Sequence, residues 1–145
     1  MTSGASGGIR ERADRLIFGR DPRLSVRLLA VAGGLFVLMF LVHLPTRYVG
    51  PLALGIGFAL PLLVGLATVA AAVGAYLNDG LLVSVALAGG VGYGFFFPLV
   101  IFDLAYPSET VLWALGTGAG FGVVSGVVGF VVGALARRVV ARLRA

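Results

Sequence analysis

Four stretches of this 145-residue chain contain no charged residue and are long enough, or nearly long enough, to cross a bilayer. A helix needs about 20 apolar residues for that crossing. The chain is 59% hydrophobic and 12% charged, which lies far outside the range of a soluble domain of this size. The stretches are continuously apolar and do not alternate with polar residues, so they favour helices over the strands of a membrane barrel. They cover residues 28–44, 50–77, 80–102 and 111–136.

We therefore predict an all-α integral membrane protein, a four-helix transmembrane bundle occupying residues 21–145. Residues 1–8 consist mainly of small polar residues and glycine, and we expect them to be disordered. Residues 9–20 place apolar side chains on one helical face and charged ones around the rest, which predicts a short amphipathic helix on the membrane surface. The predicted spans are about 25–44, 51–76, 81–102 and 110–136.

Arginine sets the predicted orientation. Ten of the eleven arginines flank the spans at the two ends of the chain, and only Arg47 falls between spans. The positive-inside rule then places both termini in the cytoplasm of a multi-pass plasma-membrane protein. The same charges predict anionic lipid headgroups at the cytoplasmic face as partners, and not nucleic acid. Arginine without lysine, together with abundant alanine, glycine and valine, indicates a GC-rich prokaryotic genome.

The last span carries a row of glycines, although glycine costs a helix about 1 kcal/mol relative to alanine. At 100° per residue the row lies on one face, as in a glycine zipper, and it predicts a close helix contact. We expect its partner in the third span, where small residues recur at every fourth position. Packing within one chain is favoured over an outward face that forms a homo-oligomer or binds other membrane subunits. The row is Gly118, Gly122, Gly126, Gly129 and Gly133, and the expected partner residues are Ala86, Gly90 and Gly94.

Two prolines occur in related contexts within the middle spans. The segments GIGFALPL (55–62) and GYGFFFPL (92–99) share the pattern G-x-G-F-x-x-P-L. We expect Pro61 and Pro98 to bend or break their helices and so to free carbonyl groups inside the bundle. Paired interruptions of this kind surround binding sites in transporters, which keeps a site hypothesis open.

The segment VGYG (91–94) resembles the core of the potassium-channel selectivity filter. The resemblance would imply an extended loop whose carbonyl groups replace the water around an ion. However, Gly90 stands where the family has threonine, and the apolar run FFFPLVIF follows. A packed glycine-rich helix is the favoured interpretation.

No Asp, Glu, Lys or Arg lies within the charge-free stretches. His43, Arg47, Asp103 and Glu109 form a weak cluster on the predicted outer side, but interfacial hydrogen bonds and ion pairs explain these residues better than a metal site. The chain has no cysteine, so it has no thiolate ligand. We therefore predict no catalytic residue, no cofactor and no metal.

These patterns favour a small non-enzymatic membrane protein that acts as a structural element or as a subunit of a membrane assembly. The alternative is a small channel or uncoupled transporter for a neutral or weakly charged solute. A conduit requires polar groups facing one continuous cavity, whereas a packing protein does not.

Overall fold

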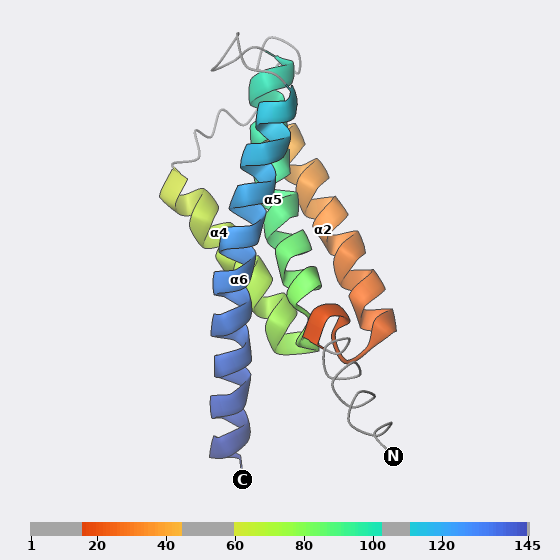
Figure 1. Cartoon of the computed structure of the whole chain (residues 1–145), viewed down its shortest axis with the longest axis vertical. Coiled ribbons are helices and arrows are strands. Elements are labelled where there is room, and N and C mark those ends of the chain that lie inside the picture. The colour runs from red at the N-terminus through yellow and green to blue at the C-terminus, as the bar shows by residue number, and fades with distance from the viewer. Residues whose placement is uncertain (1–15, 45–59, 103–110, 145) are drawn as a thin grey trace, which may run out of the picture.

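The computed structural model describes residues 16–44, 60–102 and 111–144. Within these ranges the chain is helical and forms four helices that are long and apolar enough to cross a membrane, as the sequence predicts. Residues 1–8 and most of the predicted surface helix at 9–20 lie outside the described ranges. The helices are α2 (Pro22–Val42), α4 (Leu60–Asn78), α5 (Leu81–Ile101) and α6 (Val111–Leu143) (Figure 1).

The start of α2 is fixed by local capping chemistry. Asp21 is the N-cap residue, and its carboxylate accepts a hydrogen bond of 2.9 Å from the Arg23 amide. Pro22 occupies the first helical turn, where its missing N–H costs nothing. The helix therefore begins three residues before the predicted span. It ends at Val42, with His43 as its C-cap.

Helix α5 is the centre of the fold. It packs against α2, α4 and α6, whereas α2 makes little contact with α4 (Figure 1). In its most apolar window 61% of the residues are buried, compared with 33% in α6. A helix that is apolar on every side is suited to a position surrounded by other helices. The other three spans are thus grouped around α5, and α4 and α6 also pack against each other.

Alanine and larger aliphatic side chains fill the interior. One core cluster joins α4 and α5 to Met39 of α2, and a second joins α2 to the first turns of α5. Alanines that are fully buried allow the helix axes to approach closely, as is common in membrane proteins. The first cluster comprises Met39, Leu63, Ala67, Ala71, Ala88 and Val91, and the second comprises Leu28, Ala32, Val83 and Leu87.

Helix α6 is longer than the predicted span. Its 33 residues extend to Leu143 and correspond to about 50 Å, against a hydrocarbon core of about 30 Å. Arg137, Arg138 and Arg142 therefore belong to the helix, and α6 extends beyond the end of α4 (Figure 1). The C-terminal end of α6 lies at the same end of the molecule as residues 16–18 and the turn between α4 and α5 (Figure 1). We call this the turn end.

Neither proline interrupts a described helix, and the two occupy different positions in their helices. Pro98 lies inside α5, which continues to Ile101, so the helix does not break there. The Pro98 carbonyl accepts a hydrogen bond of 3.1 Å from the Phe102 amide at the end of the helix. Pro61 is the second residue of the described part of α4. A proline in the first turn of a helix displaces no hydrogen bond, which explains how α4 accommodates it.

Candidate functional site

The glycine row of α6 lies against two neighbouring helices of the same chain. Near the middle of α6 the neighbour is α5: a Cβ atom added at Gly122 would lie 2.8 Å from the Cα atom of Gly89. Closer to the turn end the neighbour is α4: a Cβ atom at Gly129 would lie 2.6 Å from the Thr68 carbonyl oxygen. Most of these neighbouring atoms belong to the backbone, so they have little freedom to move away.

The glycines of α6 that lie outside the row have open space around them, whereas the other members of the row do not. A Cβ atom added at Gly116 or Gly120 would meet nothing within 4 Å. At Gly118 it would lie 2.5 Å from the ring of Tyr93, and at Gly126 it would lie 2.5 Å from the Cα atom of Val85. The face on which a glycine lies, and not its presence in the helix, therefore decides whether it makes a close contact.

The partner surface on α5 differs from the predicted one. Gly90 and Gly94 face α2: a Cβ atom at Gly90 would overlap the Ala32 carbonyl group, and one at Gly94 would lie 2.6 Å from the Cβ atom of Met39. Gly90 and Gly94 therefore contact α2, and the glycine row of α6 meets Val85 and Gly89 on the neighbouring face of α5. Adjacent residues in a helix point about 100° apart, so Gly89 and Gly90 serve different neighbours.

The VGYG segment is part of this central helix. Residues 91–94 are helical within α5, and Val91 is fully buried. Backbone carbonyl groups in a helix point along its axis toward hydrogen-bond partners, whereas a selectivity filter needs them to point into a pore. The resemblance to the potassium-channel filter is therefore confined to the letters of the sequence.

At the turn end, Asn78 makes the most extensive polar contacts in the described part of the chain. It is the only asparagine in the sequence and is fully buried. Its Oδ1 atom accepts hydrogen bonds from the amides of Arg20 (3.1 Å) and Asp21 (2.9 Å). Its Nδ2 atom donates to Ser25 Oγ at 2.6 Å, and this hydroxyl donates to the Phe18 carbonyl group at 2.6 Å.

Asp79, the next residue, joins two other segments. Its Oδ2 atom pairs with the guanidinium groups of Arg137, on α6, and of Arg20, which lies 3.3 Å away. The side chains of Asp79 and Arg137 are only 19% and 20% exposed, whereas that of Arg20 is 64% exposed. The Asp79–Arg137 pair is therefore the better shielded of the two. Asp79 adopts a left-handed backbone conformation with φ 61°, which a short polar side chain tolerates best.

Together these contacts form a polar cluster that sequence reasoning missed. The available signal was the presence of one asparagine and one aspartate in a short connection between two apolar spans. Nothing in the spacing of the sequence indicates that residues 58 positions apart meet there.

The predicted outer cluster is described only at His43. Its Nδ1 atom lies 2.7 Å from the Met39 carbonyl oxygen, and its ring packs edge to face on Phe95 with centroids 4.8 Å apart. Arg47, Asp103 and Glu109 lie outside the described ranges. Among residues that the structure describes, no three His, Asp or Glu side chains come together as metal ligands.

A shallow groove of about 420 Å³ runs between α2 and α6, with α5 as its floor. It is lined by apolar side chains, glycine and one tyrosine, whose phenol is the only polar side-chain group in the lining. Gly33 lies on its α2 side, and a Cβ atom there would meet nothing within 4 Å. The lining residues are Leu29, Ala32, Gly33, Phe36, Ala86, Gly90, Tyr93, Phe97 and Leu115.

Comparison with known proteins gives no relative: no family model, no curated protein and no solved structure matches the chain.

Proposed function

We propose that this protein is a non-enzymatic membrane protein that acts as a structural element or as a subunit of a membrane assembly. One observation carries the proposal: the described interior is formed mainly by close backbone contacts at glycine and by aliphatic side chains. Such an interior holds helices together by packing, which requires no acid–base or nucleophilic chemistry. In this proposal both termini face the cytoplasm of the plasma membrane, and the terminal arginines contact anionic headgroups.

The distribution of buried polar residues supports a packing role over a conduit. A path for a neutral solute needs polar groups along the whole depth of the bilayer. Among the described residues, the buried polar side chains are Ser25, Asn78, Ser84 and Ser125. The first three lie at the turn end, where Asn78 bonds to Ser25 and Ser84 bonds to the Gly80 carbonyl group of its own helix.

Flux measurements in proteoliposomes separate the two functions. For a packing protein we expect the permeation of glycerol, urea and monovalent ions to equal that of protein-free vesicles. Chemical cross-linking in native membranes should then yield a defined oligomer or complex. Gly33→Leu is the companion variant, because its side chain would extend beside the groove from a position with open space. Solute flux that Gly33→Leu abolishes would replace the proposal with the conduit.

A further inference from the structure

Residues 18–21 cross the turn end between the short helix at 16–18 and the start of α2. Gly19 lies directly against Asn78 with a positive φ of 87°, and an added Cβ atom would come within 2.7 Å of the Asn78 carbonyl oxygen. A Cβ atom at Gly80 would in turn lie 3.2 Å from the Gly19 nitrogen. Two glycines therefore allow the backbones of residues 18–21 and of the α4–α5 turn to touch.

Residues 18–21 are attached to the rest of the turn end mainly through hydrogen bonds of their own backbone. The Arg20 amide donates to the Asn78 carbonyl oxygen at 2.9 Å as well as to its side chain. The Phe18 carbonyl group accepts from Ser25, and the Asp21 amide donates to Asn78. Toward the α4–α5 turn, the described side-chain contribution of this segment is the Arg20–Asp79 ion pair, which is weak because the Arg20 side chain is largely exposed.

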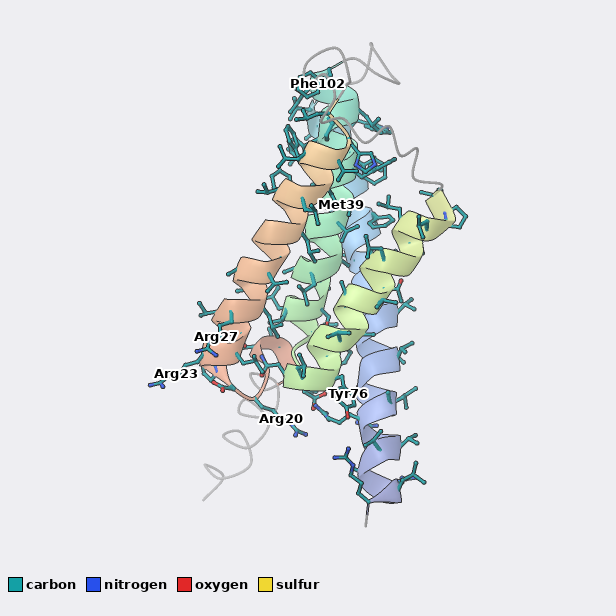
Figure 2. The ribbon with its side chains drawn as sticks, turned by 180° about the vertical axis from the view of Figure 1, so that it is seen from behind. Arg20, Arg23, Arg27, Met39, Tyr76 and Phe102 are labelled. Carbon is teal, nitrogen blue, oxygen red and sulfur yellow. The ribbon has the colours of Figure 1, made fainter. Side chains whose placement is uncertain are left out.

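The neighbouring side chains consequently remain available at the surface. Leu16 is 54% exposed and Phe18 is 57% exposed, and Arg20 lies at the turn end with Arg23 and Arg27 (Figure 2). A membrane surface or another molecule can contact these side chains without competing for the hydrogen bonds of the backbone. A force applied to these side chains would nevertheless be transmitted to the backbone hydrogen bonds with Asn78.

Asn78 couples residues 18–21 to the α4–α5 turn. Its side chain is fully buried, and among the described residues its Oδ1 atom accepts only from this segment. If the segment lifts away, the buried amide loses its partners, and leaving such a group unsatisfied is unfavourable. The favourable alternative is for the α4–α5 turn to move into water at the same time.

We propose that residues 18–21 form a releasable strap: when it is bound, it holds the turn ends of α2, α4 and α5 together, and when it is released, that end of the molecule opens. The strap also touches α6 indirectly, because Asp79 pairs with both Arg20 and Arg137. Elements with few apolar contacts and mostly polar attachments are the ones that open locally.

Thiol labelling tests the strap directly, because the chain has no cysteine of its own. Val83 and Val91 are buried valines of α5; Val83 lies in the core cluster near the turn end and Val91 in the one deeper in the bundle. We would place a single cysteine at either position in the full chain and measure its reaction with a water-soluble maleimide in detergent. Asn78→Ala removes the side chain that binds the strap, so it should increase the labelling rate of Val83→Cys about tenfold. The labelling rate of Val91→Cys should not change.

Two further variants keep the test decisive if Asn78→Ala does not fold. Ser25→Ala removes only the hydroxyl between the amide and the Phe18 carbonyl group, and Gly19→Ala strains the strap itself. Both should accelerate Val83→Cys in the same direction. Ser84→Ala is the matched control, because its buried hydroxyl bonds within its own helix and does not touch the strap. Equal acceleration at Val91→Cys, or by Ser84→Ala, would show general loosening and overturn the proposal.

Discussion

Asp79 holds more of the turn end together than any other charged residue that the structure describes. Asp79→Asn keeps the shape of the side chain and removes its charge, leaving the largely buried Arg137 guanidinium without its counter-ion. We expect a loss of about 1–3 kcal/mol in the free energy of unfolding, because removing one partner of a shielded pair is costly. Equilibrium unfolding in detergent would measure it.

The adjacent arginines provide the control for this pair. Arg137→Ala should destabilise the protein about as much as Asp79→Asn, and the double variant should cost less than the sum of the two. Arg138 is exposed, so Arg138→Ala should change stability by less than about 0.5 kcal/mol. If Arg138→Ala were as damaging as Arg137→Ala, net positive charge and not the ion pair would be what matters.

The sequence predicts the contact role of some of these residues and not of others, and the difference has a physical reason. Glycines on one helical face can be found from periodicity, because the spacing and the cost of glycine are local properties. The contacts of Asn78 and Asp79 depend on where the start of α2 and the end of α6 lie in space. The residue pattern within one segment does not predict contacts between segments that are distant in the sequence.

Among the helices, α5 is the one whose two glycine faces serve different neighbours. Gly90→Ala places a methyl group against the Ala32 carbonyl and must push α2 away, so we expect a loss of about 1–3 kcal/mol. Gly34→Ala, on α2, adds the same methyl group where nothing lies within 4 Å. It should be neutral or stabilising by up to about 1 kcal/mol, through helix propensity. Thermal unfolding of the two variants in the same detergent would compare them, and similar melting temperatures would contradict this assignment of faces.

The helices themselves were predictable, but their arrangement was not. Span lengths follow from the continuous apolar stretches, and the predicted bounds of the third span differ from those of α5 by one residue at one end. Helix α6 continues to Leu143, beyond the predicted span that ends at 136, because arginine is a good helix former and does not end a helix. The central position of α5 depends on which small faces meet, and several spans offer such faces.

For the molecule as a whole, the structure places residue 16 and the end of α6 at one end (Figure 1). Together with the arginine distribution this predicts two cytoplasmic termini. Single cysteines at Ser6 and Ala145 should therefore resist membrane-impermeant thiol reagents in intact cells and react after permeabilisation. Labelling of either position in intact cells would refute the orientation.

The packing of α6 against α5 and α4 joins three of the four spans, and a single paired substitution tests it most directly. Gly122→Leu would force a side chain into the backbone of Gly89, whereas Gly120→Leu, two residues earlier, points into open space. Lipid offers no hydrophobic compensation for lost packing, so Gly122→Leu should lower the free energy of unfolding by about 1–3 kcal/mol or more. Thermal melting and size-exclusion profiles of the two variants, recorded side by side, should show damage for Gly122→Leu and none for Gly120→Leu. Equal damage, or greater damage from Gly120→Leu, would contradict the contact.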